Sequence, residues 1–166
     1  GLDMNLINTR TRAPSYKGLK PASENASKSK KSNRNVQTEN EKVLCRELRR
    51  LGLYFRTNTP GLPGKPDIVF RSARLVVFCD GDFWHGRNWQ SLRQSLNKGT
   101  NSVYWLAKIR SNMLRDLRQT KSLKQQGWAV IRVWETDVKH DPSGTAKFIK
   151  RVVTRRRLLL QKAKAA

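Results

Sequence analysis

The sequence LPGKPDIVFRSARLVVFCDGDFWHGRNW, residues 62–89, contains the pattern around which the chain is organised. Two short apolar runs, residues 68–70 (IVF) and 75–78 (LVVF), are separated by the polar residues 71–74 (RSAR). Apolar runs of this length on either side of a short polar segment are typical of two antiparallel strands joined by a turn. The stretch therefore predicts a β-hairpin.

An acidic residue stands at the outer end of each predicted strand. Asp67 precedes the first strand and Asp80 follows the second. With a turn centred between residues 73 and 74, the two carboxylates would lie opposite each other, with β-carbons about 5 Å apart. Carboxylates this close repel each other unless a cation lies between them, and Mg²⁺ is a hard cation that takes oxygen ligands. The hairpin end is therefore a candidate metal site.

Each of these residues also has a purely structural interpretation. An aspartate beside proline or glycine is common in turns, so Asp67 by itself is equally well explained as a turn residue. A single histidine beside aromatic residues, such as His85 after Phe83 and Trp84, is more often packed in a core than used as a base. The gathering of carboxylates, an imidazole and aromatic rings at one hairpin end favours a functional site.

Several motifs in the right order resemble the very-short-patch-repair (Vsr) endonucleases, a branch of the PD-(D/E)xK nuclease superfamily. The resemblance covers residues 40–137 and rests on LPGKPDIVF (62–70), VFCDGDFWHG (77–86), YWLAKI (104–109) with Asn112, Arg115 and Asp116, and GWAV (127–130) with VWE (133–135). It implies an α/β fold with a restriction-endonuclease-like core, in which a central mixed β-sheet is flanked by helices. It also implies hydrolysis of phosphodiester bonds in DNA.

The resemblance further implies roles for individual residues. Asp67 matches the family's metal-binding aspartate, and the backbone carbonyl of Cys79 matches its second protein oxygen ligand. His85 matches the catalytic histidine, a role that suits imidazole because it titrates near neutral pH. Glu41 and Asp116 stand where the family has acidic residues. Glu41 would belong to the active site as well as to a helix cap, and Asp116 would orient the imidazole.

Two further acids follow the hairpin. Asp80 is a candidate to bind the ion directly or through water, and Asp82 stands roughly where a PD-(D/E)xK enzyme has its lysine. The well-studied members of the family have a structural zinc site made of Cys and His, whereas this chain has Asp82, Arg87 and Thr136 at the corresponding places. The sequence therefore predicts Mg²⁺ as the cofactor and no structural zinc.

The composition bounds the class of protein. A formal net charge of +23 over 166 residues and a pI near 11.1 indicate binding to a polyanion, nucleic acid first. The length suffices for one domain with a core of its own. Cys45 and Cys79 are too few for a disulfide framework and have no zinc spacing. No run of about 18 apolar residues occurs and no signal peptide is evident, so we expect a soluble cytoplasmic, nucleoid-associated protein without a membrane partner.

The chain divides into two predicted parts. Residues 1–37 are rich in Ser, Asn, Lys and Arg, and we expect a flexible basic arm that either settles on DNA phosphates or is only a solubilising tail. Residues 38–166 form the predicted endonuclease domain. Its expected elements are a helix capped by Thr38 and ended by Gly52, a strand over 53–57, the hairpin, a polar connection over 87–101, a helix over 104–126, a strand over 128–134, and a last helix starting at Asp141-Pro142.

Basic and aromatic residues are the expected DNA contacts. The predicted helix over 104–126 turns an apolar stripe inward and is strongly basic on its other faces, which indicates phosphate binding. Its outward-facing basic residues are expected to be Lys108, Arg110, Arg115, Arg118, Lys121 and Lys124. The expected DNA contacts are Lys65, Arg87, Lys108 and Arg115, together with Phe83 and Trp84. The resemblance implies that this aromatic pair enters the base stack beside the scissile phosphate.

Three functions compete. The first is a Mg²⁺-dependent endonuclease that nicks or cuts double-stranded DNA, in mismatch repair or in a restriction or mobile-element setting. The second is a non-catalytic basic nucleic-acid-binding protein of ribosomal or nucleoid type, which the charge alone favours but which gives no reason for acids to gather at one hairpin end. The third is a nuclease acting on structured RNA. Neither mismatch specificity nor an accessory repair or dimer partner follows from the sequence.

Overall fold

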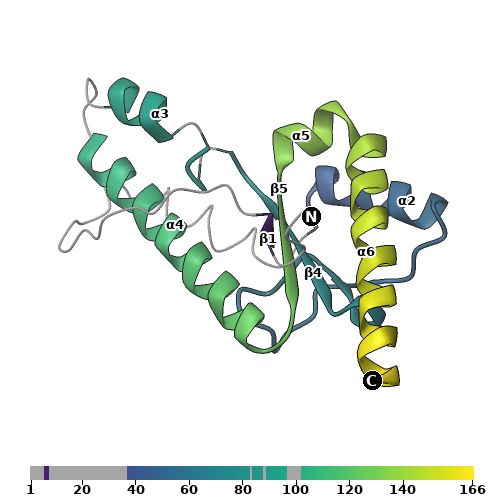
Figure 1. Cartoon of the computed structure of the whole chain (residues 1–166). Helices are drawn as coiled ribbons and strands as arrows, with labels where there is room; N and C mark the ends of the chain where they lie inside the picture. The colour runs from purple at the N-terminus through teal and green to yellow at the C-terminus, as the bar shows by residue number, and fades with distance from the viewer. Residues whose placement is uncertain (1–5, 8–36, 83, 88, 97–101) are drawn as a thin grey trace. The chain divides into compact units, whose positions relative to one another are not determined.

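The computed structural model of the chain describes residues 6–7, 37–82, 84–87, 89–96 and 102–166 (Figure 1). The helices are α2 (Glu39–Arg50), α3 (Trp89–Leu96), α4 (Ser102–Gln125), α5 (Glu135–His140) and α6 (Pro142–Ala165), and η1 (Arg71–Ala73) is a 3₁₀ turn. The strands are β1 (Leu6–Ile7), β2 (Arg56–Thr57), β3 (Ile68–Phe70), β4 (Leu75–Asp80) and β5 (Ala129–Trp134). Within the described residues none of the helices is long and apolar enough to cross a membrane.

The described residues belong to two compact units. Unit 1 contains β1, Gln37–Asp80 and Gln119–Ala166, and unit 2 contains the described part of Gly81–Arg118. Strand β1 lies within the predicted N-terminal arm, whose other residues up to 36 are outside the described part of the chain.

Unit 1 is built on a five-stranded sheet with the order β1-β5-β4-β3-β2. Strands β2, β3 and β4 pair antiparallel, whereas β5 runs parallel to both β4 and β1. The mixed sheet and the hairpin expected from the sequence are thus confirmed. The predicted strand over 53–57 is shorter than expected, because only Arg56–Thr57 pairs with β3.

The register of the β3–β4 hairpin differs from the expected one. Phe70 pairs with Leu75, so the turn is centred one residue earlier than predicted. The reason is the 3₁₀ turn η1, which Arg74 closes in the left-handed conformation (φ 47°) by donating its amide to the carbonyl of Arg71. Extending the register by one pair places Phe78, not Asp80, opposite Asp67. The expectation that the two aspartates face each other directly is therefore wrong.

Helices of unit 1 cover one face of the sheet, where α2, α5 and α6 lie together on the same side of β4 and β5 (Figure 1). Alternate residues of the strands point into this layer, including Ile68, Leu75 and Val77, and α6 contributes Ile149 and Val153. The opposite face of the sheet forms a second, smaller cluster with Leu123 of α4; its strand members are Val69, Val76, Phe78 and Val130. Both faces of the hairpin are therefore buried.

The predicted caps at the N-termini of α2 and α6 are present in the structure. The Thr38 hydroxyl accepts the amide of Glu41 at 3.2 Å, and the Asp141 carboxylate accepts the amide of Gly144 at 2.9 Å. Farther along α6, Arg156 donates from Nε to the carbonyl of Ala73 at 3.1 Å, which ties the helix to the hairpin turn.

Unit 2 contains a helix that the sequence pattern did not predict. Residues 89–96, expected to be part of a polar connection, form α3, and Trp89 at its start packs against Ile109 and Met113 of α4. Arg110 was expected on an outward face of α4, yet it is buried, with its guanidinium 5.2 Å from the Trp89 ring. In unit 1 the six-residue helix α5 was likewise not predicted, and its Val138 is fully buried.

Candidate active site

Two carboxylates meet in unit 1 where α2 begins and β3 begins. Glu41 lies in the first turn of α2, and Asp67 directly precedes β3. The Asp67 Oδ2 atom accepts the amide of Cys79 at 2.7 Å, and the carboxyl groups of Glu41 and Asp67 lie close enough to shift each other's pKa. The hairpin therefore brings the backbone of Cys79 to the same place as the two carboxylates.

Burial changes the acidity of both groups. It raises the pKa of Glu41 to about 7, assisted by the negative charge of Asp67. It also raises the pKa of Asp67 to about 6, where the amide of Cys79 acts in the opposite direction and the charge of Asp80 adds to the increase. With such values the pair is partly protonated near neutral pH, and a bound cation would displace that proton.

Asp80 has a partner that the sequence analysis missed. This residue is 3% exposed, and Nη1 of Arg132 lies 3.2 and 3.3 Å from its two carboxylate oxygens. Arg132 also donates from Nε to the Thr120 hydroxyl at 3.0 Å, and its guanidinium lies 4.0 Å from the centre of the Phe78 ring. The guanidinium thus balances the charge of Asp80 and fixes its position at the end of β4.

The position of Arg132 in the sequence could have indicated that it has a buried acidic partner. Arg132 is the only charged residue in the strand AVIRVW, residues 129–134, whose other members are apolar. A cation inside such a strand needs an acidic partner, because burying an unpaired charge is costly.

In unit 2, the side chains of His85 and Asp116 form a pair. His85 Nδ1 lies 2.6 Å from Oδ2 of Asp116, which projects from α4 and is 2% exposed. A carboxylate at Nδ1 favours the tautomer that has its proton on this nitrogen, so Nε2 becomes the basic nitrogen of the ring. The pairing of these two residues, which the resemblance implied, is present in the structure.

The turn that carries His85 is held by short contacts. The amide of His85 donates to the carbonyl of Gly81 at 3.1 Å, and Arg87 Nη1 lies 3.1 Å from the carboxylate of Asp82. Gly86 has a positive φ of 75°, and a Cβ at this position would collide with the side chain of Met113. Two of the places at which the resemblance would put zinc ligands thus hold an ion pair.

The aromatic residues of unit 2 pack on one another. Trp84 is half-buried, and its ring lies 5.4 Å from that of Trp105, which in turn lies 5.0 Å from Tyr104. Asn112 donates from Nδ2 to the carbonyl of Trp84 at 3.0 Å, and Arg115 donates to Asn112 at 3.1 Å. Phe83, the other half of the predicted wedge, lies outside the described residues.

The expected phosphate contacts have different surroundings. Lys65 is exposed on the loop before β3, and Arg115 is exposed on α4. Lys108 is half-buried on α4, whereas Arg87 is bound to Asp82.

The Cys79 thiol has a pKa well above its usual range because of burial. A metal ion would therefore meet the backbone of Cys79 rather than a thiolate.

Comparison with known proteins shows clear similarity to one family. The family described as "DNA mismatch endonuclease Vsr" matches residues 20–91. The type II nicking enzyme V.NmeDIP of Neisseria meningitidis serogroup C is 38% identical over 130 residues, which cover 78% of this chain and 86% of that protein. The type II nicking enzyme V.HpaIIP of Haemophilus parainfluenzae is 33% identical over 76% of this chain and 89% of the relative. The DNA mismatch endonuclease Vsr of Escherichia coli (strain K12) is 39% identical over 57% of this chain and 59% of its own length.

Proposed function

Because the chain belongs to the Vsr family of DNA endonucleases, we propose that it hydrolyses one phosphodiester bond in duplex DNA with a divalent cation held by the carboxylates of unit 1. The observation that carries the proposal is the pairing of the buried Glu41 with the half-buried Asp67, each of which shifts the pKa of the other. In a chain with a net charge of +23, two acids that share one partly buried site fit a cation better than they fit a purely structural role.

The donor set favours Mg²⁺. Asp67 would supply a carboxylate oxygen, the backbone of Cys79 would supply a carbonyl oxygen, and Asp80 would act directly or through a water molecule. Oxygen-only donors with one or two carboxylates suit Mg²⁺, which keeps several waters in proteins. When bound there, Mg²⁺ supplies Lewis-acid polarisation of the phosphoryl oxygen.

The residues of unit 2 move the proton. His85 Nε2 takes a proton from the attacking water while the water oxygen forms its bond to phosphorus. Asp116 holds the imidazole by its Nδ1 and stabilises the positive charge that develops on the ring. The bond from phosphorus to the leaving oxygen breaks, and that oxygen takes a proton from solvent.

We propose that a single strand is cut. Among the described residues, unit 1 contributes one Glu41–Asp67 pair and unit 2 one His85–Asp116 pair, a set of groups that suffices for one phosphodiester. Two relatives are described as nicking enzymes and a third as a mismatch endonuclease. A single mismatch is therefore the first substrate feature to test. Family membership decides against a non-catalytic nucleic-acid-binding protein.

Plasmid relaxation tests the proposal. Supercoiled plasmid and labelled duplexes with and without one mismatch are incubated with the protein in Mg²⁺ or in EDTA, beside RNA of the same sequence. We expect open-circular plasmid before any linear product, no product in EDTA and no cut RNA. Cleavage that persists in EDTA would exclude the metal mechanism, and cut RNA would point to the third function.

A further inference from the structure

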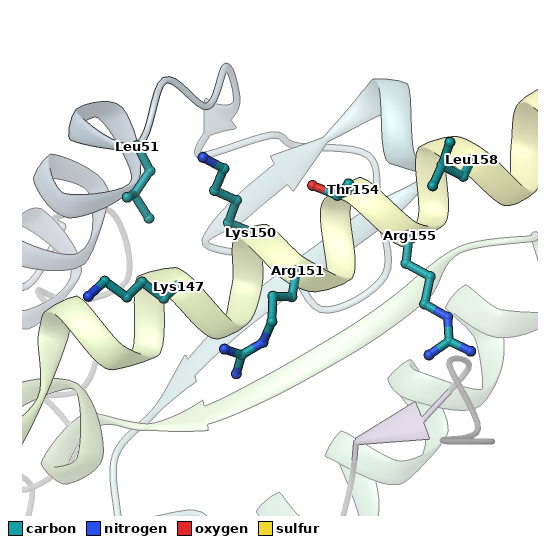
Figure 2. Close-up of a pocket in the computed structure, with 7 residues that line it drawn as sticks. All are labelled: Leu51, Lys147, Lys150, Arg151, Thr154, Arg155 and Leu158. Carbon is teal, nitrogen blue, oxygen red and sulfur yellow. The ribbon is translucent and has the colours of Figure 1, made fainter.

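A groove on the outer side of α6 lies apart from the carboxylates of unit 1. It has a volume of about 490 Å³ and is bordered by Leu51 at the end of α2 and by Leu158 on α6. Its four cations are the exposed residues Lys147, Lys150, Arg151 and Arg155. Figure 2 shows Lys150 and Leu158 along one edge of α6, with Arg151 and Arg155 along the other. We call these four cations the α6 stripe.

The stripe lies on the side of α6 that faces away from the sheet. The sheet-facing side is apolar and buried through Ala146, Ile149, Val152 and Val153. The stripe residues fall between these positions, at spacings of three and four residues, and such spacings place side chains on one face of a helix. Packing of the core therefore does not explain why they are basic.

The charge of α6 is one-sided. The helix has eight basic residues and no acid, and the basic residues are Lys147, Lys150, Arg151, Arg155, Arg156, Arg157, Lys162 and Lys164. Arg156 and Arg157 bond to the hairpin turn, through the carbonyl of Ala73 and the hydroxyl of Ser72. The groove is lined by no acidic residue in the described part of the chain. The four stripe cations thus form a surface suited to an anion.

We propose that the α6 stripe binds the phosphate backbone of double-stranded DNA as a second contact, remote from the scissile phosphate. Lys147 and Arg155 are eight residues apart, which corresponds to about 12 Å along a helix. Each DNA strand has one phosphate per 3.4 Å of axis, so the stripe spans about three or four phosphates. The inference rests on the proposed function only for its choice of polyanion.

Two features favour DNA over an acidic protein segment. The stripe cations are exposed and their long stems form the walls of the groove, whereas an anchor for a peptide would need a desolvated apolar or aromatic pocket. Among the described residues, the groove is lined by no aromatic side chain, and its two leucines stand singly at its borders. A charged, non-specific contact with phosphates requires neither.

The salt dependence of DNA binding tests the stripe. A variant with K147Q, K150Q, R151Q and R155Q is compared with a control that carries R46Q, R56Q, K139Q and K164Q. Both lower the net charge by four at exposed positions of unit 1, and glutamine keeps a helix propensity close to that of Lys and Arg. Affinity for a fluorescent duplex of about 20 base pairs is measured in EDTA at several salt concentrations, after melting curves have established that both variants fold.

We expect the slope of log K against log salt to become less negative by about two to four units in the stripe variant, at about 0.9 per lost phosphate contact, and by at most about one unit in the control. At saturating DNA the stripe variant should keep the wild-type cleavage rate. Equal slopes in the two variants would overturn the proposal and leave the groove to an acidic protein segment. Because binding is measured without metal, a less negative slope in the stripe variant supports the stripe even for a protein that cuts no DNA.

Discussion

Asp67 is the residue whose replacement should separate chemistry from binding. The change Asp67→Asn removes a proposed metal ligand and a negative charge near phosphate, so cleavage should fall by at least about 100-fold, equivalent to several kcal/mol of transition-state stabilisation. DNA affinity in EDTA should stay the same or rise. Single-turnover nicking and anisotropy measure the two effects, with Glu39→Gln as an exposed control. Near-normal cleavage by Asp67→Asn would remove this residue from the metal site.

Glu41 and Asp67 should make the stability of the metal-free protein depend on pH. Burial raises the pKa of Glu41 to about 7 and that of Asp67 to about 6, so the folded chain binds more protons than the unfolded chain between about pH 4 and pH 7. Stability must therefore fall as the pH rises through this window. In EDTA at pH 8, Asp67→Asn should be more stable than wild type by about 1 to 3 kcal/mol, because one pKa unit corresponds to about 1.4 kcal/mol. Urea unfolding at pH 4.5 and pH 8 measures this; a larger gain at pH 4.5 would contradict it.

Replacing Arg132 should destabilise the fold more than replacing either Glu41 or Asp67. Removing one partner of a buried ion pair typically costs about 3 to 5 kcal/mol, and Arg132→Leu would withdraw the guanidinium that balances Asp80. The double variant Asp80→Asn with Arg132→Leu should recover a large part of that loss, because no buried charge is left at this position. Denaturant unfolding of both single variants and the double variant measures the coupling. Additive losses would show that the pair contributes nothing beyond its separate residues.

At the scale of elements, the turn over residues 84–87, which carries His85, is the part of unit 2 most sensitive to substitution. Gly86→Ala would place a side chain at a φ of 75°, costing about 1 to 2 kcal/mol, and would also collide with Met113. We expect His85 to shift and cleavage to fall by about 10-fold or more. Gly52→Ala is the matched control, because its φ is 78° but open space surrounds it. Equal effects of the two changes on cleavage would show that the turn does not position His85.

Local patterns predicted most elements but not their fine placement. The apolar runs of the hairpin and the caps at Thr38 and Asp141 depend on neighbours in the sequence, and the structure has all of them. The predicted register of the hairpin was wrong because Arg74 adopts a left-handed conformation. Such a conformation is typical of glycine, so the sequence does not reveal it here. Helix α3 was missed because the partners of Trp89 come from α4.

Some residues of the candidate site could be predicted from the sequence and others could not, because local motifs are visible in the sequence whereas contacts between distant segments are not. The resemblance indicated Asp67, Cys79, His85 and Asp116 from motifs whose order is visible in the sequence. The contact between Asp80 and Arg132 joins residues 52 positions apart, and nothing local in either segment specifies its partner. The raised pKa values of Glu41 and Asp67 likewise follow from burial, which depends on how α2 packs on the sheet.

At the scale of the whole molecule, a net charge of +23 should make DNA binding steeply dependent on salt. If the chain neutralises more than about five phosphates, log K should fall with log salt at a slope steeper than about −4.5. Residues 1–37 carry eight basic residues and two acids. Replacing Lys28, Lys30, Lys31 and Arg34 with glutamine keeps β1 in the chain. This replacement should make the slope less negative only if the segment engages DNA. A nearly flat response of wild type would mean that the charge serves another purpose.

The bond from Arg156 to the carbonyl of Ala73 bears on how the chain acquires its structure during synthesis. It joins residues 83 positions apart, and the same helix supplies Ile149, Val152 and Val153 to the core that α2 also enters. Loops of this length cost entropy before their contacts repay it, so folding with so many distant contacts is slow. On the ribosome, the hairpin emerges long before the helix that covers it. The nascent chain is therefore expected to expose an apolar sheet face until α6 has left the exit tunnel.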